Sequence, residues 1–190
     1  MKMNNISVPT YNFSIEAYHK LVAVGILKQD DKVELIEGKI VIINPIKSAH
    51  AACVDRLGDI LKQRFGKKAI IRSQNPIVLG THSEPEPDLA AVDYKADYYE
   101  NAHPKPKEVF IAIEISQSTE SYDRTIKIPL YAKFSIREVW LVNLNKKVVE
   151  VYQRPKKNTY TSTTIYSLKD KIQSEFIKPL AVKRIIKQTS

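Results

Sequence analysis

The sequence predicts a mixed α/β domain in which a helix is followed by three or more strands, a second helix and another strand, with a β-rich C-terminal end. Three observations predict it. Residues 48–65 carry apolar side chains at helical spacing. Short β-branched and aromatic runs, separated by proline and glycine, follow. The 190 residues contain no repeat, low-complexity tract or linker, which favours a single domain over residues 1–190.

An N-terminal helix and hairpin precede this core. Ser14 can cap a helix and Gly25 can end it, and apolar residues between them recur at helical spacing, at Ile15, Tyr18, Leu21 and Val22. Val33–Glu37 and Lys39–Ile43 flank Gly38 and therefore predict a hairpin.

The first core helix is predicted to begin at Ser48, which can cap it, and to stop at Gly66. Its buried face is predicted at Ala52, Cys53, Leu57, Ile60, Leu61 and Phe65. Four strands are then predicted, at Ala69–Ser73, Ile77–Leu79, Asp88–Val92 and Val109–Ser116.

A second core helix is predicted over Arg124–Phe134, although Pro129 fits only a first turn or a kink and leaves its start open. The chain then returns to β-structure. The predicted strands are Val139–Leu144, Lys147–Tyr152 and Tyr160–Tyr166.

Composition excludes several classes of protein. Cys53 is the only cysteine, so the chain has no internal disulfide and no CxxC zinc or redox pair. No apolar run approaches the roughly 20 residues that span a bilayer. Residues 1–11 lack an apolar segment and a cleavage site, so we expect no export signal and a cytoplasmic protein. The net charge of +9 favours a polyanionic partner.

Two acids stand in two of the predicted strands. Asp88 follows Pro87 at the start of one, and Glu114 lies inside the apolar run Val109–Ser116, which we expect to be buried on both faces. Burying a carboxylate without a partner is costly. Either a divalent cation shared with Asp88 or an Arg or Lys at a strand end would compensate Glu114.

Lys127 adds a third polar group. It lies in the predicted helix after the strand of Glu114, and this helix can fold back over the end of that strand. Two acids and a lysine around a metal ion are the groups that phosphodiester hydrolysis needs. The metal neutralises phosphate charge and activates water, while the lysine orients the water or stabilises developing charge.

These residues belong to a longer pattern. The chain resembles the Uma-two family of restriction-endonuclease-like proteins, a branch of the PD-(D/E)XK nuclease superfamily. The resemblance rests on Ile15–Tyr18, Val33–Val41, His50, Glu84–Leu89, Glu114–Thr119, Asp123, Lys127, Tyr131 and Glu138–Val142. It implies a restriction endonuclease-like core of helix, three strands, helix and strand, with a mixed central sheet flanked by helices.

The resemblance also implies a site and a reaction. Asp88 and Glu114 would bind Mg²⁺, or Mn²⁺ in its place, with the backbone carbonyl of Ile115, and the substrate would be DNA. The chain departs from the superfamily pattern at Ser116, which stands where a D/E-x-K motif has its lysine. Lys127 is the position that matches a lysine displaced onto the following helix.

Two further residues match the family, and each has two interpretations. Glu34 either adds a carboxylate at the edge of the metal site or is a surface-facing strand residue. His50 lies in the first turn of its helix, where it either contacts a phosphate or a metal-bound water, or is a partly buried residue bonded to a backbone carbonyl.

Asp123 and Tyr131 lie on the predicted helix with Lys127. Asp123 is four residues before Lys127, so the two can form an intrahelical ion pair that holds the lysine in place. Tyr131 is one turn after Lys127, where it can brace the lysine or belong to the core.

The sequence therefore supports two functions. The first is a Mg²⁺-dependent endonuclease acting on DNA; the alternative is a catalytically silent nucleic-acid-binding or assembly module on the same fold. Cleavage in the presence of metal distinguishes them. By analogy with nucleases that cut two strands by pairing two copies, we also expect a homodimer.

Overall fold

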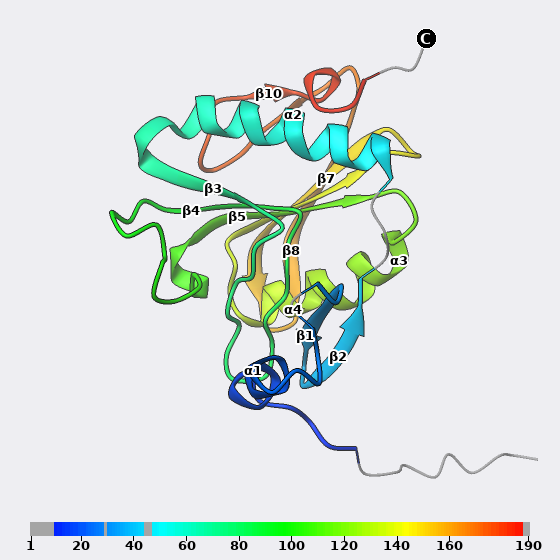
Figure 1. The fold of residues 1–190 in the computed structure, drawn as a ribbon. Coiled ribbons are helices and arrows are strands. Elements are labelled where there is room, and N and C mark those ends of the chain that lie inside the picture. Colours follow the sequence, from blue (N-terminus) through cyan, green and yellow to red (C-terminus); the bar gives the residue numbers. More distant parts are fainter. Residues whose placement is uncertain (1–9, 29, 44–46, 188–190) are drawn as a thin grey trace, which may run out of the picture.

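Helices cover both faces of one six-stranded sheet in the computed structural model, which describes residues 10–28, 30–43 and 47–187 (Figure 1). Strands β5 and β6 pair in parallel, and all other neighbours pair antiparallel. In spatial order the strands are β3 (Ala69–Ser73), β4 (Leu89–Asp93), β5 (Val109–Ser116), β6 (Glu138–Asn143), β7 (Val148–Lys156) and β8 (Thr159–Ser167). This confirms the mixed central sheet flanked by helices.

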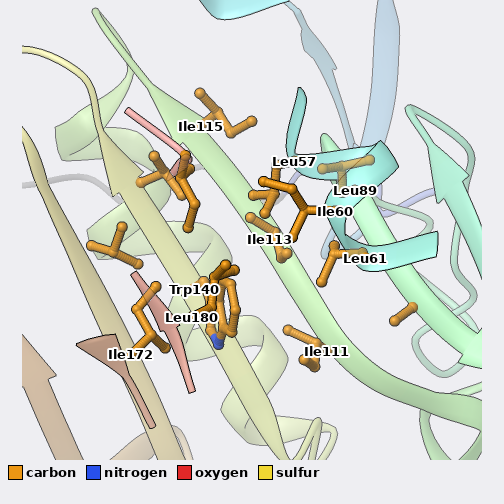
Figure 2. Packing of buried hydrophobic residues seen from close by; sticks show 14 of the residues in the cluster. Leu57, Ile60, Leu61, Leu89, Ile111, Ile113, Ile115, Trp140, Ile172 and Leu180 are labelled. Atoms are coloured by element: carbon orange, nitrogen blue, oxygen red, sulfur yellow. The ribbon is translucent and has the colours of Figure 1, made fainter. Parts of the chain in front are cut away.

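Helix α2 (Ser48–Phe65) covers one face of the sheet. Its apolar side packs on the sheet, as Figure 2 shows for Leu57, Ile60 and Leu61 beside Leu89 of β4 and Ile113 of β5. The C-terminal segment closes the same cluster with the two-stranded sheet β9 (Lys171–Ile172) and β10 (Leu180–Ala181). The predicted β-rich end thus contributes both to the main sheet, through β7 and β8, and to this small sheet.

The opposite face carries the helical segment between β5 and β6, with α1 and the hairpin beyond it (Figure 1). That segment consists of α3 (Glu120–Tyr122), a π-helical turn (Asp123–Lys127) and α4 (Ile128–Lys133). A second cluster of buried apolar residues lies on this face, and it contains Leu130 and Tyr131 from α4 and Ala112 and Leu141 from the sheet. Because strand side chains alternate, Ile113 and Ile115 face α2, whereas Glu114 and Ser116 point toward the helical segment.

The N-terminal elements form as predicted. Helix α1 (Ile15–Ala23) is capped by Ser14, whose hydroxyl accepts a hydrogen bond from the Ala17 N–H at 3.2 Å. Strands β1 (Val33–Ile36) and β2 (Lys39–Ile42) form a separate two-stranded sheet. Gly38 in their turn has a φ of +77°, and a Cβ there would lie 2.6 Å from that of Asn12, so only glycine fits.

Three predictions about local structure are wrong. Ser48 is the first residue of α2 rather than its cap, which is Lys47. Ala52 is exposed, and Val54 is buried in its place. In Ile77–Leu79 the two outer residues are buried, but the run joins no sheet, because its N–H groups donate to loop carbonyls, including that of Pro104 at 2.9 Å.

The helix predicted at Arg124–Phe134 begins earlier, at Glu120, and contains the π-helical turn. This turn accounts for Pro129. In an α-helix the proline ring would clash with the carbonyl four residues earlier, and the wider turn just before it avoids that contact. The N–H of Ile128 accordingly donates to the carbonyl of Asp123, five residues back.

None of the helices formed by the described residues is long and apolar enough to cross a bilayer. The prediction that the N-terminus carries no export signal concerns mainly residues 1–9, which lie outside the described residues.

We expect Leu61→Ala to lower the free energy of unfolding by about 2–5 kcal/mol, because Leu61 is fully buried between α2 and the sheet and its truncation leaves a cavity. The control is Ile165→Ala on the exposed side of β8, where 62% of the residue's surface is accessible and the loss should stay below about 1 kcal/mol. Urea titration measures both, and equal losses would contradict the packing described.

Candidate active site

The register of β4 and β5 brings Asp88 and Glu114 together. Leu89 pairs with Ile113 in this antiparallel ladder, so extending the register by one residue places Asp88 opposite Glu114. Directly opposed residues of an antiparallel pair have Cβ atoms about 5 Å apart. The two acids of the sequence pattern therefore share one end of the sheet.

Asp88 is held from two sides. Its Oδ2 accepts a hydrogen bond from the Ile115 N–H at 2.8 Å and lies 2.9 Å from Nε2 of His50, in the first turn of α2. Burial lowers the pKa of His50, but the hydrogen bond and charge of Asp88 outweigh it, so that the pKa is raised overall. His50 is thus a largely buried residue whose main partner is this carboxylate, and a hydrogen bond with the backbone of Ile115 also raises its pKa.

The backbone of Ile115 faces the same point. Because the N–H of Ile115 points to Asp88, its carbonyl lies on the same edge of β5. The residue opposite Ile115 in the extended register is Pro87, which has no N–H to donate. The Ile115 carbonyl therefore has no strand partner on this side, and His50 is the group that the backbone of Ile115 influences, since it raises the pKa of that imidazole.

Lys127 reaches this end of the sheet from the π-helical turn. Its ammonium lies 3.0 Å from Oε1 of Glu114 and 3.2 Å from Oε2 of Glu34, and it donates to the carbonyl of Glu86 at 3.3 Å. Burial lowers the pKa of Lys127, but the charges of Glu114 and Glu34 outweigh it and raise the pKa, so the amine stays protonated. The predicted fold-back of the helix over the strand is confirmed.

Glu34 lies inside the site and is buried, so the surface-facing interpretation is wrong. Besides contacting Lys127, its Oε2 accepts a hydrogen bond from the Glu86 N–H at 3.0 Å, and its Oε1 accepts one from the Tyr122 hydroxyl at 3.3 Å. Glu34 therefore attaches the N-terminal hairpin to both the helical segment and the chain before β4.

Tyr131 contacts Glu114 rather than Lys127. The Tyr131 hydroxyl, fully buried, donates to Oε1 of Glu114 at 2.5 Å. Burial raises the pKa of Glu114, while Lys127 and this hydroxyl lower it, and burial prevails. A further positive charge at this position would therefore stabilise the Glu114 carboxylate.

Asp123 is close enough to raise the pKa of Glu114, but it makes no ion pair within 4 Å with Lys127. Its Oδ2 instead accepts a hydrogen bond from the Thr119 hydroxyl at 2.7 Å. Burial raises the pKa of Asp123 to about 6, against the lowering by that hydroxyl. The predicted intrahelical pair is absent from the described residues because Lys127 turns toward Glu114 and Glu34.

These residues suit a cation with a small protein ligand set. Asp88, Glu114 and the Ile115 carbonyl offer oxygen atoms, and the Oε2 atom of Glu114 takes part in no hydrogen bond among the described residues. No three Asp, Glu, His or Cys side chains of the described chain are grouped to hold a metal ion by themselves. Mg²⁺ commonly takes one or two carboxylates and keeps several waters, which matches this donor set.

Two polar contacts near the site were not predicted. The Tyr122 hydroxyl donates to Glu34, and the two terminal nitrogens of the Arg124 guanidinium, Nη1 and Nη2, donate to the buried carboxylate of Glu150 on β7. Glu150 carries the same signal as Glu114, an acid inside an apolar strand, and a search for such acids would have found it. Nothing in the local sequence indicates the partner of Tyr122, which is distant along the chain.

Comparison with known proteins gives a family and a fold. Residues 15–182 match the model of the Uma2 family, described as "Putative restriction endonuclease". A crystal structure described as that of a putative nuclease from Anabaena variabilis superposes with a TM-score of 0.70 at 18% sequence identity, covering 91% of this chain and 97% of that one. The search of curated proteins found no match.

We expect Lys127→Met to lower the free energy of unfolding by about 3 kcal/mol in EDTA, because it leaves Glu34 and Glu114 buried without their cation. Lys62→Met is the control. Lys62 makes an exposed pair with Asp59 at 3.5 Å, and its loss should cost less than about 0.5 kcal/mol. If urea titration found both variants equally stable, Lys127 would not carry the charge balance described.

Proposed function

The chain belongs to the Uma2 family of putative restriction endonucleases, and on this premise we propose that it hydrolyses phosphodiester bonds of DNA with the help of a divalent cation. The observation that carries the proposal is the 3.0 Å contact between the Lys127 ammonium and Glu114. This contact lies at the end of the sheet where Asp88 is opposite Glu114. A positive group and two carboxylates at one point are what the reaction needs.

The metal ligands in this proposal are the carboxylates of Asp88 and Glu114 and the carbonyl of Ile115, with Mg²⁺ or Mn²⁺ as the ion. When bound, the ion neutralises phosphate charge and lowers the pKa of water. The Ile115 N–H and His50 fix the Asp88 carboxylate through its Oδ2 atom. Tyr131 fixes Glu114 in the same way through Oε1.

Lys127 supplies the remaining charge. Hydrolysis joins a water oxygen to phosphorus and breaks the bond to the leaving oxygen, which takes up a proton. Negative charge develops on the phosphate oxygens in the transition state. An ammonium fixed by Glu34 and the Glu86 carbonyl stabilises that charge without having to reorient. Asp123 lies beside these groups and keeps the helical turn attached to Thr119.

Polyanionic DNA suits the charge of the chain. Thirty Lys and Arg residues against 21 Asp and Glu give a net charge of +9, although the site itself is rich in acids. The basic remainder of the chain therefore attracts the phosphate backbone, while the acids of the site hold a cation.

We expect Asp88→Ala and Lys127→Ala each to reduce metal-dependent plasmid nicking at least about 100-fold, because each removes a group that stabilises the transition state. Wild type is assayed beside them with Mg²⁺, Mn²⁺ or EDTA. Asp59→Ala, an exposed residue of α2, is the matched control and should cut like wild type. Circular dichroism confirms that each variant is folded.

Undiminished nicking by Asp88→Ala would contradict the proposed site. If wild type binds DNA in EDTA with a steep salt dependence but cuts neither DNA nor RNA with either metal, the protein is a binding module instead. RNA cut in preference to DNA would correct the substrate.

We further propose that two copies act together, by analogy with nucleases that cut both strands. Light scattering at the assay concentration should then give twice the chain mass of 21.7 kDa, with or without DNA. A monomeric mass in both conditions would contradict the homodimer.

A further inference from the structure

Gln74 extends the pair formed by Asp88 and Glu114 into a row of three polar residues across the sheet. Ser73 pairs with Leu89 in the ladder of β3 and β4, so the next residue, Gln74, is opposite Asp88. The Gln74 N–H donates to the Asp88 carbonyl at 3.2 Å, in agreement with this pairing. Asp88 therefore has Glu114 on one side and Gln74 on the other.

The side-chain amide of Gln74 also reaches the carboxylate of Asp88. Its Nε2 lies 3.5 Å from Oδ1 of Asp88, whereas Oδ2 is occupied by His50 and the Ile115 N–H. Within the described part of the chain, Oδ1 and the Gln74 amide have no other hydrogen-bond partner, and 3.5 Å is a long bond. The amide can therefore form a shorter bond with another group while it stays beside Asp88.

The row is closed at one end and open at the other. Glu114 is buried against Lys127 and Tyr131. Gln74 is exposed and follows β3, which is an edge strand of the six-stranded sheet. A molecule from solvent can therefore contact the Gln74 amide, but not the far side of Glu114.

The backbone of Gln74 is strained. Its φ is +52°, in the left-handed region that glycine adopts freely and other residues adopt at a cost. Such conformations are found preferentially at functional sites. A glycine would form the same turn without strain, so the turn alone does not account for a glutamine at this position.

A neutral amide suits a position beside a cation site. A glutamine amide carries two N–H groups, so it can donate to Asp88 and to a second acceptor at once. A lysine here would pair with Asp88 and compete with the cation, whereas glutamine adds no charge. Phosphate oxygens accept such hydrogen bonds from side-chain amides in nucleic-acid complexes. The free N–H of Gln74 therefore matches a phosphate oxygen next to Asp88.

Arg72 adds a positive charge on the same face of the sheet. It pairs with Ala90, which belongs to the apolar cluster shared with α4, so its side chain lies on the face that carries Glu114. Its Nη2 donates to Oδ1 of Asn75 at 3.3 Å, which orients the guanidinium. A phosphate beside Gln74 is therefore near a cationic side chain as well as near the acids.

We propose that Gln74 is a substrate-binding residue: its amide donates a hydrogen bond to the DNA phosphate that the cation holds at Asp88 and Glu114. This proposal rests on the nuclease function proposed above. Gln74 takes up and releases no proton. It fixes the phosphate on the open side of the row, while Lys127 stabilises charge on the closed side.

The test is Gln74→Gly, with binding of a fluorescein-labelled DNA duplex measured by fluorescence anisotropy in Ca²⁺ and in EDTA. Ca²⁺ takes oxygen ligands as Mg²⁺ does, and the readout is binding rather than cleavage. We expect Kd in Ca²⁺ to rise at least about fivefold, because a hydrogen bond to a charged group is lost, and Kd in EDTA to stay unchanged. The thermal midpoint should stay close to that of wild type, because glycine fits this φ.

Two further variants complete the design. Gln74→Asn tolerates the left-handed backbone but is one methylene group shorter, so it should also lose affinity in Ca²⁺ without freeing the backbone. Gln173→Gly is the matched control. Gln173 is an exposed glutamine next to β9, with its amide 3.4 Å from the Lys171 carbonyl, and its loss should leave Kd unchanged in both conditions.

Each outcome decides the proposal. Wild-type affinity of both Gln74 variants in Ca²⁺ overturns it, and leaves the nuclease function standing if wild type nicks plasmid with Mg²⁺. A loss confined to Gln74→Gly assigns the effect to backbone freedom, and an equal loss in EDTA assigns Gln74 to contacts away from the cation; both overturn it. A wild type that neither binds more tightly in Ca²⁺ nor cuts with Mg²⁺ removes the nuclease function first and this inference with it.

Discussion

The buried ammonium of Lys127 is the constraint on which the arrangement of the site depends. A charge removed from water needs partners from every side, and this one obtains them from three separate parts of the chain: Glu34 of the hairpin, the Glu86 carbonyl before β4, and Glu114 of β5. The hairpin is a separate two-stranded sheet, so these contacts tie it to the core beside the bridge between Leu35 and Glu84. The charge balance of the site and the position of the N-terminal elements thus have the same cause.

The helical segment sets where that ammonium lies. A regular α-helix through Pro129 would lose a hydrogen bond and bring its ring against a carbonyl, and the π-helical turn at Asp123–Lys127 relieves the contact. Arg124 in the same turn bonds the buried Glu150 of β7, which anchors the turn to the sheet. The π-helical turn, an irregularity that Pro129 signals in the sequence, therefore carries Lys127 to the site.

Sequence patterns predicted the elements whose signals are local. The spacing of apolar residues located α2, and the alternation of β5 placed Glu114 in a buried strand. The strand predicted at Ile77–Leu79 was wrong because this apolar run satisfies its backbone hydrogen bonds through loops, which composition does not show. The partners of Asp88 and Glu34 could not be predicted from spacing, since His50 and Tyr122 reach them only through the packing of α2 and the helical segment.

Placing the lysine on a helix rather than on β5 changes what the strand can do. A lysine two residues after Glu114 would fill the space beside that carboxylate with its own chain, whereas serine leaves room there and adds a hydroxyl. The positive charge then comes from a separate element, because Lys127 reaches Glu114 from the helical segment at 3.0 Å while Glu114 itself lies on β5. Groups held on separate elements can each be fixed by their own packing, which is the condition for a preorganised site.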